Sequence, residues 1–275
     1  ISGIAWDHVN IYPTWEAYVD QFELLAEAMP KGGILVFDES DDMLDVIGQK
    51  ERADITKVPY QAHKSEIIDN QTFLVDKQGN KILVQLFGDY NLKNISGAMT
   101  ICDRIGITEN QFYEAIPSFK PVALRLEKIA ERISSDSRKR IIIRDYAHSP
   151  AKVEASIEAV KKQYSTEKLY AILELHSFSS LSKSFLIEYK NTLSAADVAE
   201  VYYNNNDQPY RDQSVPITTQ DVERSFGRSD LNVFTESNKM QRFLIDNKSE
   251  ADVFLFMSSG NFDQIDLNAL SSQLL

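Results

Sequence analysis

The sequence predicts an α/β protein with two domains. Its 275 residues, 43% hydrophobic and 25% charged, suit a soluble globular chain longer than one average domain. Apolar runs such as Ile34–Phe37 and Arg140–Arg144 are each followed by a helix-forming segment, as in α/β folds. The pattern changes near Ser118–Pro121, a loop-like segment, so we expect domains at 1–121 and 122–275.

The first domain is predicted to hold a mixed sheet with an antiparallel hairpin. Ile34–Phe37 follows two glycines and precedes Ser40–Asp42, a polar run that indicates a helix start. Thr72–Val75 and Lys81–Phe87 flank a Lys-Gln-Gly-Asn turn, which predicts a hairpin at the edge of a sheet. The other elements expected here are a strand at Ile67–Ile68 and helices at Tyr90–Ile105 and Glu109–Ile116.

In the second domain, strands and helices alternate. The expected strands are Arg140–Arg144, Leu169–Leu173, Val198–Tyr203, Leu231–Phe234 and Val253–Met257. The expected helices are Ala151–Gln163, Ser182–Leu193, Thr219–Phe226, Lys239–Asn247 and Asn268–Leu275. This alternation implies right-handed crossovers, and therefore a doubly wound domain whose mostly parallel sheet is covered on both faces.

Composition excludes several classes of partner. With 41 acidic and 29 basic residues the net charge is −12, which argues against nucleic acid or an anionic membrane surface as a partner. The longest apolar runs are far shorter than the roughly 20 residues that span a bilayer. Cys102 is the only cysteine and has apolar neighbours, so we expect a core residue in a reducing, cytoplasmic compartment. The opening from Ile1 has no signal-peptide pattern and is typical of a piece of a longer protein.

Two sequence clusters place acidic and histidine residues at strand ends. In WDHVNIYP, Asp7 and His8 follow a short apolar segment that we expect to be a strand. In RDYAHSP, Asp145 and His148 follow the buried strand RIIIR. Carboxyl ends of strands are where α/β sheets bind ligands, and the polar loop MSSGNFDQI follows another such strand. Both clusters are therefore candidate sites.

Two further clusters have the chemistry of nucleotide contacts. In GDYNLKN, Asn91 and Asn94 lie three apart, on one face of the helix that they open, which suits hydrogen bonds to a flat base. Arg125 lies just past the domain boundary, where a guanidinium can close on phosphate. The phosphate-binding patterns GxxxxGK[ST] and GxGxxG are missing from the sequence, so a phosphate cradle would lie upstream of Ile1 or on another chain.

Structural interpretations compete with these assignments. A lone histidine such as His8 is often a hydrogen-bonded structural residue, and asparagines at a helix start are often caps. Arg125 is also consistent with a solvated residue at a strand edge. His63 has no motif around it and is interpreted as a surface residue. The acidic residues between 38 and 45 are interpreted as a solvated helix start, although carboxylates so grouped can imitate a metal site.

Taken together and in this order, the clusters resemble the second half of the Mur ligase family, the ATP-dependent amide-bond-forming enzymes of peptidoglycan assembly. The resemblance covers nearly the whole chain: WDHVNIYPTWEAYVDQF is similar to the central ATPase domain, and DYAHSP to the C-terminal domain. It implies partnership with missing N-terminal domains of the same protein. ELHSFSSLS and MSSGNFD look most like the murein peptide ligase branch, with UDP-N-acetylmuramate–L-alanine ligases as the alternative.

The resemblance implies roles for residues of the first domain. His8 matches a ligand of a magnesium ion that bridges ATP and an acyl phosphate. Asn91 and Asn94 match the pair that binds adenine. Tyr90 stands where the family often has histidine, and a tyrosine can still stack on a base or donate one hydrogen bond.

In the second domain, the resemblance implies that Arg125 reaches phosphate on domain closure and that Asp145 lies near the ribose and phosphates. His148 belongs to the same signature. The implied parent enzyme joins L-alanyl-γ-D-glutamyl-meso-diaminopimelate to UDP-N-acetylmuramate through an acyl phosphate, with ATP and Mg²⁺ as cofactors. The alternatives are L-alanine as the amino substrate, or a non-catalytic α/β binding module. Because the phosphate loop is missing, we expect the isolated chain to be inactive.

Overall fold

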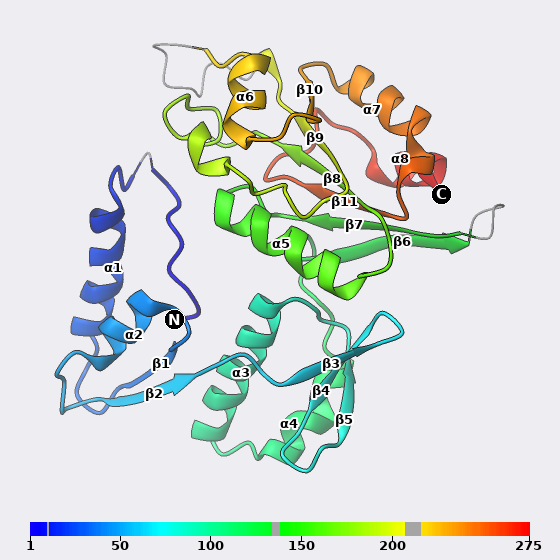
Figure 1. Ribbon diagram of the computed structural model, residues 1–275. Coiled ribbons are helices and arrows are strands. Elements are labelled where there is room, and N and C mark those ends of the chain that lie inside the picture. The colour runs from blue at the N-terminus through cyan, green and yellow to red at the C-terminus, as the bar shows by residue number, and fades with distance from the viewer. Residues whose placement is uncertain (10, 134–137, 207–215) are drawn as a thin grey trace. The chain divides into compact units, whose positions relative to one another are not determined.

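The computed structural model describes residues 1–9, 11–133, 138–206 and 216–275. The chain forms two compact units, Ile1–Lys120 and Pro121–Leu275, and each is described by itself. Both contain helices and strands (Figure 1), so the α/β class predicted from the sequence is confirmed.

Unit 1 begins with a strand-and-helix layer. Strand β1 (Ile34–Asp38) pairs in parallel with β2 (Thr56–Tyr60). Helices α1 (Trp15–Glu27) and α2 (Asp42–Gln49) cover β1 through a shared apolar core. The predicted helix start is confirmed, and its N-cap is Asp41, whose side chain accepts hydrogen bonds from the first turn of α2.

The second layer of unit 1 contains the predicted hairpin. Its strands are β3 (Ser65–Ile68), β4 (Gln71–Val75) and β5 (Lys81–Val84), and its helices are α3 (Asp89–Arg104) and α4 (Glu109–Ala115), followed by the 3₁₀ turn η1 (Ile116–Ser118). The hairpin β4–β5 is confirmed. Its place at the edge of a sheet is also confirmed: with β3 it forms a three-stranded antiparallel sheet in the order β3-β4-β5, which packs on α3 and α4. Cys102 is half-buried against this core.

The segment before Asp7 is not a strand, contrary to the prediction. Asp38 N–H donates to the Ile1 carbonyl, so the segment touches the free edge of β1. The contact goes no further, because Ile4 N–H donates to the Asp41 side chain instead of to a neighbouring strand. The ladder along β1 therefore ends after one residue.

Unit 2 is built on one six-stranded sheet. Its strands are β6 (Glu127–Ile133), β7 (Lys139–Asp145), β8 (Leu169–Glu174), β9 (Val198–Tyr202), β10 (Asn232–Phe234) and β11 (Val253–Met257). The order across the sheet is β10-β9-β8-β11-β7-β6. All neighbours are parallel except β6 and β7, which are antiparallel. The predicted parallel sheet is confirmed, but β6 was not predicted, because its charged sequence EKIAERI lacks a buried strand's apolar run.

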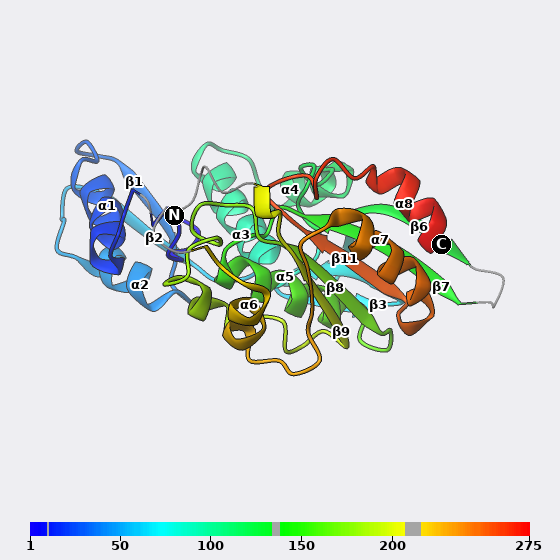
Figure 2. The same ribbon diagram turned by 90° about the horizontal axis from the view of Figure 1, so that it is seen from above.

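Helices cover both faces of this sheet, as predicted. Its helices are α5 (Pro150–Gln163), α6 (Thr219–Phe226), α7 (Ser237–Asp246) and α8 (Leu267–Leu274). Helices α7 and α8 bury apolar side chains against Tyr170, Ile172, Phe254 and Phe256. Since side chains alternate along a strand, α5, which packs against β8 and β11, covers the opposite face (Figure 1). Figure 2 shows β9, β8 and β11 side by side from above.

The connections reverse direction at β11. The chain leaves β7 through α5, on one face, whereas it leaves β11 toward α8, on the other. Strand β11 lies between β7 and β8, so neighbouring strands send their following segments to opposite faces. Such a switch point opens a crevice at the carboxyl ends of the strands, which is where doubly wound folds bind ligands.

The prediction of an α-helix at Ser182–Leu193 is wrong. Among its residues, only Leu186–Tyr189 form a helix, the 3₁₀ helix η2. The backbone bonds here connect residues three apart, as in Glu188 N–H to Phe185 O. The apolar residues of this segment are nevertheless buried: Tyr189, for example, is fully buried and stacks on Phe226 of α6. Tertiary packing thus replaced the α-helix with a tighter turn.

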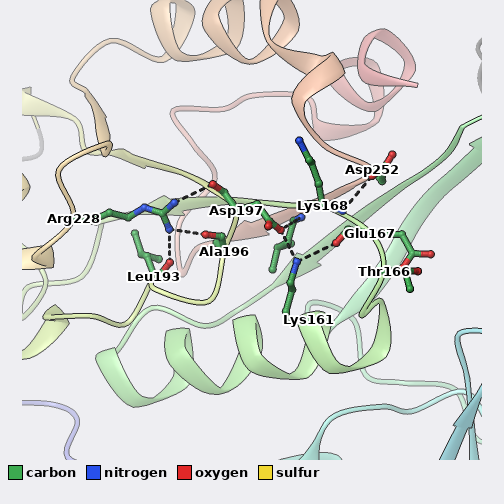
Figure 3. Close-up of polar contacts among 10 residues, drawn as sticks. Lys161, Thr166, Glu167, Lys168, Leu193, Ala196, Asp197, Arg228 and Asp252 are labelled. Carbon is green, nitrogen blue, oxygen red and sulfur yellow. Dashed lines mark hydrogen bonds and ion pairs between the residues drawn. The ribbon is translucent and has the colours of Figure 1, made fainter.

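Charged side chains stabilise the amino edge of the sheet, the edge at which the parallel strands begin (Figure 3). The Arg228 guanidinium donates to the carbonyls of Leu193, Ala196 and Asp197 at 2.6, 2.7 and 3.0 Å. The Asp197 carboxylate accepts the backbone N–H of Leu169 at 2.8 Å and pairs with Lys161 at 2.5 Å. These contacts fix the points where β8 and β9 begin. Within the described residues, no helix is both long and apolar enough to cross a membrane.

Candidate functional site

Asp145 ends β7 at the carboxyl edge of the unit 2 sheet. Only 4% of it is exposed. Its Oδ2 accepts the backbone N–H of Leu126 and its Oδ1 that of Ala147, both at 2.6 Å. Burial raises the pKa of Asp145, although these two N–H groups and the charge of Arg125 act in the opposite direction. The Asp145 carbonyl accepts Ser258 N–H at 3.1 Å, which ties the loops after β7 and β11 together.

Arg125 lies beside this carboxylate. Its guanidinium carbon is 5.3 Å from the centre of the Tyr146 ring, a cation–π contact. The residues on either side, Leu124 and Leu126, have φ of 63° and 44°. Leucine avoids this left-handed region, so the loop is strained around the exposed arginine. The Glu127 carboxylate accepts Leu124 N–H at 2.9 Å, which helps hold the strained backbone.

His148 completes the cluster predicted from the DYAHSP signature. Its Nδ1 is 2.8 Å from the Tyr146 carbonyl, and its ring packs edge-on against the Tyr146 ring. Because a carbonyl can only accept, Nδ1 is the donor in this bond. The Tyr189 hydroxyl donates to the His148 carbonyl and fixes the backbone of this loop. The structure therefore brings Arg125, Asp145 and His148 to one place.

Glu174 is a second buried carboxylate at the same edge, and sequence reasoning missed it. It ends β8 with 2% exposed surface. Its Oε2 accepts the hydroxyl of Ser258 and, at 2.8 Å, the N–H of Phe262. Gly260 fits only without a side chain, since a Cβ would lie 2.7 Å from His176 and 2.9 Å from Glu174. The missed signal was a carboxylate that ends an apolar strand, as at Asp145.

The loop after β11 has the longest run of left-handed residues in the described part of unit 2. Phe262, Asp263 and Gln264 are consecutive and all left-handed, with φ of 51°, 57° and 64°. The Asn261 side chain accepts Gln264 N–H at 3.0 Å and closes the turn. Three such residues cost several kcal/mol at roughly 1–2 kcal/mol each, and strain of this kind gathers at binding sites. The polar loop predicted to approach a ligand thus has a fixed, unusual shape.

In unit 1, the predicted base-binding residues lie at the start of α3. Asn91 is 7% exposed, and its Nδ2 donates to the Phe87 carbonyl at 2.8 Å. Asn94 is exposed and Tyr90 is half-buried. The helix N-cap is Gly88, so the alternative in which Asn91 or Asn94 caps α3 is wrong. With its amide nitrogen donating to Phe87, Asn91 has its Oδ1 left to act as acceptor.

The interpretation of the acidic residues between 38 and 45 as a solvated helix start is wrong for Asp38. This residue ends β1 and is fully buried. Its Oδ2 pairs with Lys93 of α3 at 2.8 Å, and its Oδ1 accepts the Ser40 hydroxyl at 2.6 Å. Burial opposes ionisation, but Lys93 and Ser40 together outweigh it and hold the pKa of Asp38 below its usual value. Asp38 thus anchors α3, the helix that carries the asparagines.

His8 is exposed and has φ of 57°. Its carbonyl accepts N–H groups from Ile11 and Tyr12, and its own N–H donates to buried Asp7. Mg²⁺ prefers several oxygen ligands. Within the residues that the structure describes, no group of three His, Cys, Asp or Glu side chains is placed to hold a metal ion. These residues alone do not form a magnesium site.

His63 is buried, contrary to its interpretation as a surface residue. Its Nδ1 lies 2.8 Å from the Lys64 carbonyl, and its Nε2 lies 2.8 Å from the Tyr113 hydroxyl. Its backbone N–H donates to the Leu92 carbonyl at 3.2 Å. His63 therefore has a structural role: it joins the start of the three-stranded sheet to α3 and α4.

Comparison with known proteins follows this geometry. Residues 1–102 match the model of the Mur ligase middle domain, and residues 125–260 match that of the Mur ligase glutamate ligase domain. The UDP-N-acetylmuramate–L-alanine ligase of Porphyromonas gingivalis is 25% identical over 94% of this chain and 57% of its own length. The chain belongs to the Mur ligase family. It spans little more than half the length of this curated relative.

Solved structures share the fold. A murein peptide ligase from Psychrobacter arcticus superposes with a TM-score of 0.57 and 17% identity, over 98% of this chain and 56% of that one. MurF ligase from Thermotoga maritima, solved in complex with ADP, gives a TM-score of 0.68 with 16% identity over 97% of this chain and 60% of that one.

Proposed function

We propose that this chain is the second half of an ATP-dependent ligase that joins an amine to the carboxylate of UDP-N-acetylmuramate. In this assignment, residues 1–121 are the C-terminal part of the central ATPase domain, and residues 122–275 are the C-terminal domain. The observation that carries the proposal is the cluster of Arg125, Asp145 and His148 at the carboxyl edge of a doubly wound sheet. Membership of the Mur ligase family supports it.

The chemistry requires charge neutralisation. A carboxylate is a poor acylating agent, and phosphorylation by ATP converts it to an acyl phosphate that an amine can attack. The exposed Arg125 guanidinium is a fork of donors suited to phosphate oxygens. Asn91 presents Oδ1 as an acceptor, which suits the exocyclic amine of adenine. We propose that His148, through its hydrogen bond to the Tyr146 carbonyl and its contact with the Tyr146 ring, orders the loop beside Arg125.

ATP and Mg²⁺ are the proposed cofactors. The fit differs between them. The start of α3 has the amide chemistry that a base needs, which supports ATP. His8 offers one nitrogen and has no cluster of oxygen ligands around it within the described ranges. We therefore assign no reaction step to a metal held by this chain alone.

Two amines are candidates for the acceptor. The ELHSFSSLS segment favours L-alanyl-γ-D-glutamyl-meso-diaminopimelate, the sequence-based prediction. The name of the Porphyromonas gingivalis relative favours L-alanine. The segment's His176 lies against Gly260 in the loop after β11, and we propose that this segment contributes to the choice of amine.

The test is a ligation assay on the complete gene product with ATP and UDP-N-acetylmuramate. Phosphate release that depends on one of the two amines is the expected result, and the preferred amine identifies the branch. A product that releases no phosphate with either amine contradicts the proposal. The isolated 275-residue chain has no GxxxxGK[ST] pattern and is expected to release none. Phosphate release by that chain above a heat-killed control, abolished by His8→Ala, contradicts this second expectation.

A further inference from the structure

We propose that Asp145 is a positioning residue for Arg125, and that it acts by holding the backbone on both sides of the Arg125–Tyr146 contact. The role differs from the direct contact with ribose and phosphates that the family resemblance implies. Its consequence for turnover rests on the proposed function, whereas its consequence for the shape of the loop does not.

The first observation is where the two carboxylate oxygens go. Oδ2 accepts the N–H of Leu126, the residue after Arg125, and Oδ1 accepts the N–H of Ala147, the residue after Tyr146. Arg125 and Tyr146 form the cation–π contact, and the residue after each of them donates its backbone N–H to the Asp145 carboxylate. Because only 4% of Asp145 is exposed, water competes little for these hydrogen bonds.

The second observation is that the held backbone does not keep its shape by itself. Leu124 and Leu126 are both left-handed, and leucine with its Cβ disfavours that conformation. Three hydrogen bonds hold these residues in the left-handed conformation: Leu126 N–H to Asp145, Leu124 N–H to Glu127, and Tyr146 N–H to the Leu124 carbonyl. Without the Asp145 contact, Leu126 returns toward an ordinary conformation and redirects the Arg125 side chain.

A structural experiment tests this without any assay of activity. In the 275-residue chain, the Arg125 Nε–Hε signal in an NMR spectrum is displaced by the Tyr146 ring current and is assigned by its loss in Arg125→Lys. Asp145→Asn keeps the size of the side chain, but its amide nitrogen cannot accept a hydrogen bond, so the signal is expected to move toward that of a solvated arginine. An Arg125 signal unchanged in folded Asp145→Asn overturns the proposal.

Asp197→Asn is the matched control. Asp197 also accepts a backbone N–H, that of Leu169 at 2.8 Å, but at the amino edge of the same sheet. It is expected to leave the Arg125 signal in place. If Asp197→Asn moves that signal as far as Asp145→Asn does, the effect is a general loosening of the fold and the proposal fails.

If Asp145→Asn does not fold, a second variant tests the proposal. Glu127→Gln weakens the neighbouring contact to Leu124 and is expected to shift the Arg125 signal in the same direction, but by less. No shift in that folded variant overturns the proposal.

A kinetic experiment on the complete gene product then tests the effect on turnover. Loss of one charge-assisted contact predicts a fall in kcat of about 10- to 100-fold in Asp145→Asn, with a smaller change in the KM for ATP. In an Arg125→Gln background, the same change is expected to have little further effect, because its target is gone. Fully additive losses contradict positioning. If no ligase activity exists at all, the proposed function fails while the NMR result still decides the role of Asp145.

Discussion

The two edges of the unit 2 sheet use similar charged groups in different ways. At the amino edge, Arg228 binds three carbonyls and Asp197 binds a backbone N–H, so charge closes the start of the strands. At the carboxyl edge, Asp145 and Glu174 also bind backbone N–H groups, but Asp145 holds the loop that presents Arg125 to solvent and Glu174 holds the loop after β11. Buried or backbone-bonded charge alone therefore does not distinguish a binding edge from a structural one.

Backbone strain is what separates the edges. In the described part of unit 2, the left-handed residues in the segments that precede β9 and β10 are Asn191 and Gly227, types that tolerate this conformation. Those around the carboxyl edge are Leu124, Leu126, Phe262, Asp263 and Gln264. Four of these five residues, the two leucines, Phe262 and Gln264, are of types that have no local reason to adopt it. Their conformation is imposed by tertiary contacts, which is the arrangement expected where shape serves a ligand.

A large effect on stability is expected at the amino edge. Arg228→Met removes the guanidinium and leaves three carbonyls without their shared donor. We expect the free energy of unfolding to fall by about 3 kcal/mol, because bonds to a charged donor contribute about 1.5–3 kcal/mol each and water replaces part of them. Urea denaturation of the 275-residue chain measures this. A loss below about 0.5 kcal/mol would show that this edge is not held by Arg228.

The next effect concerns a carboxylate between the edges. Glu200 lies on β9, is fully buried and accepts the Tyr170 hydroxyl, while its Oε2 has no hydrogen-bond partner among the described residues. Burial raises the pKa of Glu200 from 4.5 to about 8. The folded state thus resists ionisation, and the free energy of unfolding decreases as pH rises between these values, then levels off.

Glu200→Gln removes this penalty. The variant is expected to exceed the natural chain in stability by about 2–4 kcal/mol above pH 8 and to match it closely near pH 4.5. Thermal unfolding across this pH range makes the measurement. An equal stability difference at both ends of the range would contradict a titrating Glu200 as the cause.

The smallest effect tests the strain directly. Gln264 is exposed and left-handed, so Gln264→Gly is expected to stabilise the chain by about 1 kcal/mol. Gln220 is also exposed but lies in α6, and Gln220→Gly is expected to destabilise it by about 0.5–1 kcal/mol. Opposite signs in urea denaturation support strain at the carboxyl edge. Destabilisation by both substitutions would indicate that the left-handed turn is not strained.

Much of the fold was predictable because its signals are local. Apolar runs and helical periodicity gave the parallel sheet of unit 2, and a strand-end carboxylate pointed to Asp145. The same signal at Glu174 and Asp38 was available and was missed. By contrast, no sequence rule places Leu124 and Leu126 in the left-handed region, since leucine disfavours it. The burial of His63 depends likewise on Tyr113, fifty residues away.

The central claim, that the carboxyl edge serves the ligand and the amino edge the fold, is tested most directly by one substitution made at both edges. Lysine keeps the charge of arginine but loses its planar fork. In the complete gene product, we expect Arg125→Lys to lower amine-dependent phosphate release by about 10-fold or more with an almost unchanged melting temperature. We expect Arg228→Lys to lower the melting temperature while phosphate release by the folded enzyme is retained. Normal turnover in Arg125→Lys, or lost turnover in folded Arg228→Lys, would contradict the account.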